Sequence, residues 1–425
     1  MSAATITETS VPARGGHAHP ANRPPLIDVS RMVPEVAVAF LIEHAVNAGA
    51  SDLFFLSDEK HVTVKVRHLG LVHEVAHLPS EMGKRCLGHI RANAAIDLGE
   101  KRRPIDGRWI YRKPDGQVID LRINIIPAMY GEDVAFRLLV RSHALLSLER
   151  LGLTPTQLSA YQQMISCPSG LILITGPTGS GKTATLYSSM VKLNDGTKKI
   201  NTIEDPVEYA IEGLRQSQVN PAIDIGFAEL LRAVLRQSPD VIMIGEIRDQ
   251  ETARTAVHAA NSGVVVFATL HSPSTATAVQ AIRAFGVHNH FLATSLRGIV
   301  SQRLVRTLDP ETRVGYDLSE SPGTFNEVKH LLAAGEGSKL YAPRPAETNQ
   351  FTGYTGRTGV FEVMSITPAL RNLISDGAPA REIRAKAIEE KMLEFRLSAL
   401  LKVAQGVTTM EEIFRVIPTE HLVEE

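Results

Sequence analysis

The spacing of apolar and polar residues changes near residue 150, which divides the chain into two parts. In the first part, apolar runs of strand length lie at 52–56, 62–67, 71–75, 118–126 and 133–141. Stretches with helical spacing lie at 36–48 and 81–95, and Asp115-Gly116 predicts a tight turn between strands. This mixture predicts an α+β domain.

The second part alternates strands with helices. Its continuous apolar runs, which are typical of strands buried on both faces, lie at 171–175, 200–203, 241–244 and 264–269. Helical segments fall between these runs, so we expect an α/β domain with a parallel sheet covered by helices. Glycine, proline and polar residues at 322–354 predict a loop-rich insertion, and 368–416 has helical character.

These patterns predict a division of the chain into segments. The predicted segments are a flexible tail at 1–33, the α+β domain at 34–142, a linker at 143–152, the α/β core at 153–307, the insertion at 308–357, and a C-terminal strand and helical region at 358–425. The tail is expected to be flexible because its small, polar and proline residues bury too little apolar area to offset the loss of conformational entropy.

Composition narrows the class of protein. The net charge is -1, from 45 basic and 46 acidic residues, which argues against a dedicated nucleic-acid binder. Cys86 and Cys167 stand far apart, so neither a disulfide framework nor a cysteine-built zinc site is expected. No apolar run approaches the roughly 20 residues of a membrane span. We expect a cytoplasmic protein that reaches a membrane through partners.

The strongest chemical signal is a glycine-rich run that fits the phosphate-loop pattern G-x-x-x-x-G-K-[ST], between an apolar strand and a helical segment. The expected nucleotide contacts are Gly176, Pro177, Thr178, Gly179, Ser180, Gly181, Lys182, Thr183 and Ala184. Lys182 would bridge the β- and γ-phosphates of ATP, and the Thr183 hydroxyl would bind Mg²⁺. A glycine-rich turn that binds nothing is the alternative, and the flanking strand and helix argue against it.

Hydrolysis of ATP also requires a carboxylate near the γ-phosphate. The apolar strand at 241–244 leads through Gly245 to Glu246, an arrangement typical of a Walker B carboxylate that binds Mg²⁺. Arg248 and Asp249 follow, and are expected to form an ion pair and to cap the next helix.

A second acidic group comes directly after the strand at 200–203. Glu204, Asp205 and Glu208 surround Pro206, which ends the strand and turns the carboxylates toward the edge that carries the phosphate loop. Three carboxylates this close repel one another unless a metal, an arginine or water compensates. The alternative interpretation is an acidic, solvated loop.

His271 lies just after the strand at 264–269. A single histidine is most often a structural residue with satisfied hydrogen bonds. Its place beside the other strand ends allows a second role, in which it senses the γ-phosphate or steadies a carboxylate.

The order of the motifs resembles that of the ATPases that drive type II secretion and type IV pilus assembly. The motifs are Ala50-Ser-Asp-Leu53, Glu100-Lys-Arg-Arg-Pro-Ile-Asp-Gly-Arg108, the phosphate loop, Thr202-Ile-Glu-Asp-Pro-Val-Glu-Tyr209, Leu231-Arg-Ala-Val-Leu-Arg-Gln-Ser-Pro-Asp240, Gly245-Glu-Ile-Arg-Asp249, Ala268-Thr-Leu-His271, Gln302-Arg-Leu-Val-Arg306 and Thr352-Gly-Tyr-Thr-Gly-Arg-Thr-Gly-Val-Phe361. The resemblance covers roughly residues 36 to 416.

The resemblance implies a PAS-like N-terminal domain, a RecA-like P-loop ATPase core and a hexamer that acts on an inner-membrane platform protein. It makes Glu208 the catalytic carboxylate, Glu246 the Walker B residue and His271 the histidine-box residue. The remaining acids of the aspartate box, Glu204 and Asp205, would then lie at the nucleotide.

Four arginines acquire roles from the same resemblance. Arg122 and Arg137 match arginines that reach the phosphates from the N-terminal domain, and Arg232 and Arg236 match a pair near the subunit boundary. A guanidinium group suits the charge spread over the γ-phosphate oxygens. An ordinary surface ion pair is the alternative for each of them.

The chain departs from this family at one module. Many secretion-type members bind zinc through four cysteines after the histidine box, and the matching positions here hold Asp309, Thr312, Ala346 and Asn349. Without thiolates we expect no zinc and a mobile insertion.

Three alternative functions stay open. A pilus retraction motor of the same superfamily would share the core motifs, although the insertion favours an assembly or secretion motor. A DNA-directed RecA-like motor conflicts with the neutral charge. A nucleotide-binding scaffold without turnover conflicts with Lys182, Glu208 and Glu246.

Overall fold

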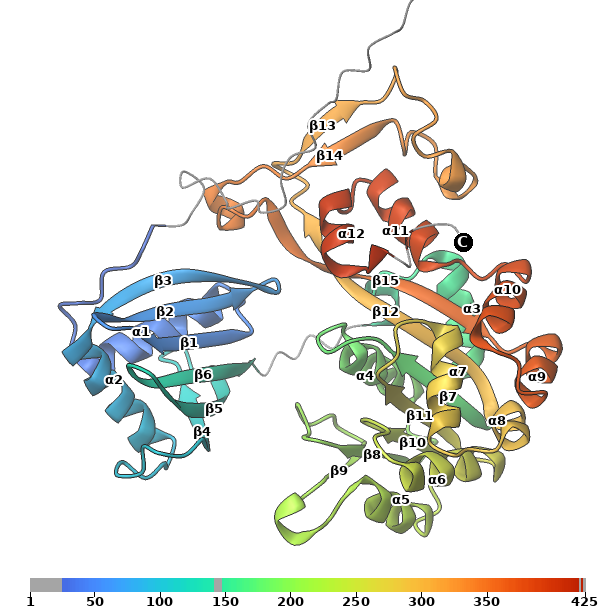
Figure 1. Cartoon of the computed structure of the whole chain (residues 1–425), viewed down its shortest axis with the longest axis horizontal. Helices are drawn as coiled ribbons and strands as arrows, with labels where there is room; N and C mark the ends of the chain where they lie inside the picture. Colours follow the sequence, from blue (N-terminus) through green and yellow to red (C-terminus); the bar gives the residue numbers. More distant parts are fainter. Residues whose placement is uncertain (1–24, 141–146, 420–421, 423–425) are drawn as a thin grey trace, which may run out of the picture.

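The computed structural model describes residues 25–140, 147–419 and 422. The chain forms an N-terminal domain and a larger domain that carries the insertion and the C-terminal helices (Figure 1). Most of the predicted tail and the first four residues of the predicted linker lie outside the described residues.

The N-terminal domain is built on an antiparallel sheet. Within the described residues, its strands in spatial order are β3 (Leu71–Pro79), β2 (His61–His68), β1 (Asp52–Ser57), β6 (Gly131–Val140), β5 (Val118–Ala128) and β4 (Ile105–Arg112). Helices α1 (Pro34–Asn47) and α2 (Ser80–Asn93) pack together with the sheet around one apolar core. The sequence analysis did not predict β4, which has no fully buried residue. The α+β mixture agrees with the sequence expectation.

Packing of this domain begins ahead of residue 34. The backbone N–H of Ile27 donates a hydrogen bond to the carbonyl oxygen of Val75 on β3, at 2.7 Å. The side chain of Val29 is only 1% exposed and joins the same core. The segment from Ile27 onward is therefore held by the sheet, unlike the tail predicted for 1–33.

The larger domain is built on a predominantly parallel sheet. Its strands in the described residues, again in spatial order, are β15 (Tyr354–Ser365), β12 (Leu296–Leu308), β7 (Gly170–Thr175), β11 (Val265–Leu270), β10 (Val241–Ile244), β8 (Ile200–Glu204) and β9 (Arg215–Gln218). β15 pairs antiparallel with β12, and the other strand pairs described for this sheet are parallel. Polar residues interrupt the apolar pattern of β12 and of β9, which explains why neither was predicted.

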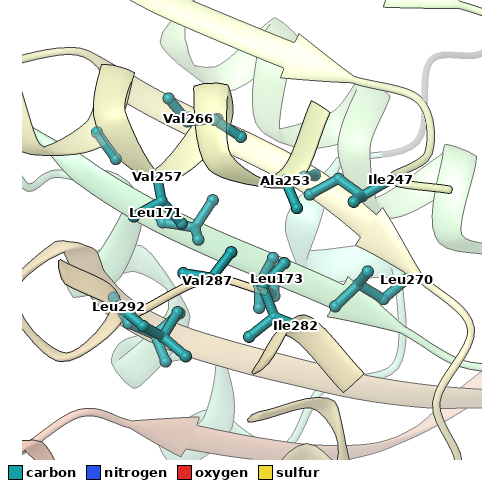
Figure 2. Packing of buried hydrophobic residues seen from close by; sticks show 14 of the residues in the cluster. Leu171, Leu173, Ile247, Ala253, Val257, Val266, Leu270, Ile282, Val287 and Leu292 are labelled. Carbon is teal, nitrogen blue, oxygen red and sulfur yellow. The ribbon is translucent and has the colours of Figure 1, made fainter. Parts of the chain in front are cut away.

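Alternate residues of the central strands pack on opposite faces of this sheet. Leu171 and Leu173 of β7 lie in an apolar cluster with α6 (Gln250–Asn261), α7 (Thr275–Ala284) and α8 (Asn289–Ser295), as Figure 2 shows. Ile172 and Ile174 pack on the other face with α3 (Pro155–Ile165) and α4 (Lys182–Leu193). Burying each such side chain contributes about 1.5–3 kcal/mol. Two-sided burial explains the continuous apolar runs.

The C-terminal part is helical, as predicted. Its helices are α9 (Pro368–Ser375), α10 (Ala380–Glu389), α11 (Phe395–Ala404) and α12 (Met410–Val416). The insertion carries a short antiparallel pair, β13 (Val314–Asp317) and β14 (Lys339–Ala342), which lies beyond α11 and α12 in Figure 1.

Hydrogen bonds join the base of the insertion at the positions that match the zinc-binding cysteines of the family that the sequence resembles. The side-chain amide of Asn349 donates to Asp309 Oδ2 at 3.0 Å and to Thr312 Oγ1 at 2.9 Å, and the Thr312 hydroxyl donates to Asp309 Oδ2 at 2.8 Å. The Asn349 side-chain oxygen accepts from the backbone N–H of Ala346 at 2.9 Å. The four positions are thus held together by side-chain and backbone groups.

We predict that Asn349→Ala loosens the insertion. The substitution leaves the nearly buried oxygen atoms of Asp309 with fewer donors, so amide hydrogen exchange across 309–353 should be about tenfold faster. Glu320→Ala, at an exposed position of the same insertion, is the control.

A chelator tests whether a metal contributes to the stability of the insertion. Because hydrogen bonds replace thiolates at the base, incubation with EDTA should leave the exchange of 309–353 unchanged. Faster exchange after chelation would mean that a metal holds the insertion.

Lys402 of α11 joins the C-terminal helices to the start of the larger domain. Its side chain is 7% exposed, and its ammonium group donates to the carbonyl oxygen of Gly152 at 2.7 Å. Burial lowers the pKa of Lys402 from its ordinary value of 10.5 to about 8. Between these values the unfolded chain binds a proton that the folded chain does not, so stability rises with pH in this window.

We therefore predict a pH-dependent difference between the wild type and Lys402→Met. The wild type should gain stability relative to the variant as pH rises from about 8 to 10.5, and the difference should be flat below about 7. Thermal melting at a series of pH values measures this, with the exposed Lys101→Met as the control. A difference that stays constant across the window would contradict the burial of a charged Lys402.

Candidate functional site

The carboxyl ends of four parallel strands place the predicted residues along one edge of the sheet. The phosphate loop follows β7, the acidic segment follows β8, and Glu246 and His271 follow β10 and β11. Because these strands are adjacent and parallel, the segments that follow them meet at the same edge.

The phosphate loop requires glycine at its first and last turns. Gly176 and Gly181 have φ of 147° and 90°, values that favour glycine. A Cβ atom on Gly176 would stand 2.5 Å from the carbonyl oxygen of Gln302 and 2.7 Å from Ser180 Oγ. The loop is therefore tightly wound against β12.

The polar groups of the loop suit a bound phosphate. The Lys182 ammonium donates to the carbonyl oxygens of Gly176 and Pro177, at 2.8 and 3.0 Å, and Ser180 Oγ is buried without a hydrogen-bond partner. Burial lowers the pKa of Lys182, while the nearby Glu246 carboxylate acts in the opposite direction. Thr183 is exposed in the first turn of α4, whose N-terminus favours an anion.

Gln302 supports this loop from β12. Its side-chain amide donates to the carbonyl oxygen of Ser180 at 2.9 Å, and its side-chain oxygen accepts from the Thr185 hydroxyl at 2.8 Å. Gln302 is 1% exposed. The sequence motif that contains Gln302 gave it no role, because its contact with the loop joins residues 122 positions apart.

Glu246 lies at the centre of a charged network. Its Oε1 is 2.8 Å from His271 Nε2, and its Oε2 accepts from Arg248 Nε at 2.7 Å. Arg248 also donates to Asp205 Oδ2 at 2.9 Å, which joins the Walker B carboxylate to the acidic segment. Although burial lowers the pKa of Arg248, the hydrogen bonds and charges of both carboxylates raise it above its ordinary value. Arg248 thus forms its ion pairs with Glu246 and Asp205, partners that the sequence analysis did not name, and Asp249 caps α6 by accepting from Thr252 N–H.

The acids of the segment after β8 differ in exposure. Asp205 is exposed and Glu208 is partly buried. Glu204 is only 3% exposed, and its carboxylate accepts from Tyr187, Thr202 and Gln216. Glu204 thus lies beneath the segment, whereas Asp205 and Glu208 lie at its surface.

Only one of the four predicted arginines contacts this edge within the described residues. Arg122 on β5 donates to the carbonyl oxygen of Val207 at 3.1 Å, which brings the N-terminal domain to the acidic segment. Arg137 forms an ion pair with Asp52, at 3.7 Å.

The other two predicted arginines belong to α5 (Phe227–Leu235) and its end. Arg232 forms an ion pair with Glu251 on α6, and Arg236 is exposed at the end of α5.

Comparison with known proteins gives the family. A model described as "Type II/IV secretion system protein" matches residues 30–415. The chain is 39% identical over 380 residues to type II secretion system protein E of Dickeya dadantii, covering 89% of this chain and 75% of that protein. It is 39% identical over 383 residues to the type IV pilus assembly ATPase PilB of Pseudomonas aeruginosa, covering 88% of this chain and 65% of that protein.

Solved structures are similar in fold. The ATPase DotB of Legionella pneumophila has a TM-score of 0.69 at 21% identity, covering 91% of this chain and 96% of that chain. The pilus retraction motor PilT with bound ADP has a TM-score of 0.59 at 24% identity, covering 89% and 96%. Both support the RecA-like fold predicted from the sequence.

In the described parts of the chain, no helix combines the length and the apolar character needed to cross a membrane. The glycine-wound phosphate loop, the carboxylates at the neighbouring strand ends and the match over nearly the whole chain agree with one another. The chain belongs to the type II/IV secretion system protein family and is a P-loop ATPase.

Proposed function

We propose that this protein is a Mg²⁺-dependent ATPase motor that drives assembly of a pilus or pseudopilus, or protein secretion, through an inner-membrane platform protein. One observation carries the proposal: the charged network of Asp205, Arg248, Glu246 and His271 lies at the same sheet edge as the phosphate loop. A scaffold that only binds nucleotide has no need for two carboxylates at this edge.

Different residues bind the phosphates, hold the metal and act on the attacking water. Lys182 and the loop N–H groups bind the phosphates of ATP, which replace the carbonyl oxygens that Lys182 contacts in this structure. Thr183 and Glu246 are the residues that would hold Mg²⁺, which when bound offsets negative charge on the phosphate oxygens. Glu208 orients the attacking water and accepts its proton. His271 fixes the rotamer of Glu246 by its contact with Oε1.

Arg122 supports a link between hydrolysis and domain movement. Its hydrogen bond to Val207 joins the N-terminal domain to the segment that carries Glu208. A change at the γ-phosphate would therefore alter the contact between the two domains. The hexameric ring and the platform partner are suggested by membership of the family, and the exposed Arg236 is accessible to a neighbouring subunit.

We predict that Glu246→Gln abolishes turnover while ATP binding is kept. The amide has nearly the same shape but lacks the charge that holds Mg²⁺, so phosphate release from Mg²⁺-ATP should fall by about a hundredfold or more. Binding of a fluorescent ATP analogue should persist because Lys182 and the loop are unchanged.

Glu229→Gln is the matched control, since Glu229 is an exposed carboxylate on α5. This variant should hydrolyse ATP at the wild-type rate. Wild-type turnover in Glu246→Gln would overturn the assignment of Glu246. Absence of turnover in the wild type at concentrations that form rings would favour a nucleotide-binding scaffold.

A further inference from the structure

Side chains, rather than a sheet or helix, hold the backbone of the segment that carries Glu208. Residues 205–211 belong to no strand or helix of the structure. The Gln216 side chain donates to the carbonyl oxygen of Tyr209 at 3.1 Å and accepts from the backbone N–H of Ile211 at 2.7 Å. The position of this segment therefore depends on the side chains beneath it.

The backbone N–H of Glu208 itself donates to the hydroxyl oxygen of Tyr187, at 3.3 Å. Tyr187 is 1% exposed, and its hydroxyl donates to the carboxylate of Glu204, which is 3% exposed. The Tyr209 ring packs edge-on against the Tyr187 ring, with centroids 4.7 Å apart. Tyr187 thus contacts the segment through both its oxygen and its ring.

Glu204 determines which way the Tyr187 hydroxyl points. A phenol has one proton to donate, and donating it to Glu204 leaves the oxygen lone pairs for the Glu208 N–H. Burial, and then the charge of Glu204, raise the pKa of Tyr187, so this proton is kept. The other Glu204 oxygen accepts from Thr202 and Gln216, which fixes the carboxylate in turn. A buried network whose members are all bonded is rigid.

We propose that Tyr187, oriented by Glu204, is a positioning residue that fixes Glu208 relative to the phosphate loop. Tyr187 and Lys182 belong to the same helix, α4, so one rigid element contacts both the phosphates and the segment of the hydrolytic carboxylate. Glu204 then acts through Tyr187 and does not touch nucleotide. This inference rests on the proposed function, in which Glu208 acts on the attacking water.

Tyr187→Phe tests the inference, because it keeps the ring and removes the hydroxyl. In the purified full chain we expect kcat for Mg²⁺-ATP to fall about three- to tenfold, with KM and the affinity for a fluorescent ATP analogue unchanged. Amide hydrogen exchange of 205–211 should become faster, whereas that of the phosphate loop should not. Tyr316→Phe, at an exposed tyrosine of the insertion, is the matched control.

Glu204→Asp tests the second member, since it withdraws the carboxylate from Tyr187 by one methylene. The same two changes should appear, in the same direction. Weaker binding of the ATP analogue, with unchanged exchange of 205–211, would instead make Glu204 a nucleotide contact and overturn the inference.

Glu208→Gln separates this inference from the function on which it rests. An inactive Glu208→Gln beside a Tyr187→Phe variant with wild-type kcat and exchange would overturn the positioning role alone. A fully active Glu208→Gln would remove the hydrolytic role of Glu208, whatever the exchange of 205–211 shows.

Discussion

The site depends on burial of both faces of a parallel sheet. Strands β7, β8, β10 and β11 are buried along their whole length and are covered by helices on either side. Polar chemistry can therefore occur only where these strands end, and their parallel direction puts the ends at one edge. The phosphate loop, both carboxylate segments and His271 come together for this reason.

Like charges are crowded at this edge, so the carboxylates need positively charged or hydrogen-bonding partners. Glu246 and Asp205 are brought close by neighbouring strands, and Arg248 compensates both of them while His271 contacts the free side of Glu246. Beneath them, hydroxyl and amide donors satisfy the buried Glu204. Asp205 is exposed at the surface, whereas Glu204 is buried and bonds to side chains that contact the backbone of the segment. Two neighbouring acids of one segment thus serve different purposes.

The sequence predicts the parts of this arrangement that are local. The phosphate loop, the apolar strands on either side of it and the cap at Asp249 follow from residues a few positions apart. The pairing of Gln302 with the loop, and of Tyr187 with Glu204, joins residues 17 to 122 positions apart, and no periodicity reveals such contacts. Strand β12 was missed because polar residues such as Gln302 and Arg303 interrupt its apolar pattern, and contacts distant in sequence bury these two side chains. The roles of Arg137, Arg232 and Arg236 at the nucleotide stay predictions.

The most direct test of the account is a structure of this chain with Mg²⁺ and a non-hydrolysable ATP analogue. The account predicts that the Lys182 ammonium exchanges the carbonyl oxygens of Gly176 and Pro177 for phosphate oxygens, that Glu246 lies at the metal, and that Tyr187 and Glu204 stay bonded. A nucleotide bound away from the loop, or a Lys182 that keeps its carbonyl contacts with the analogue in place, would contradict it.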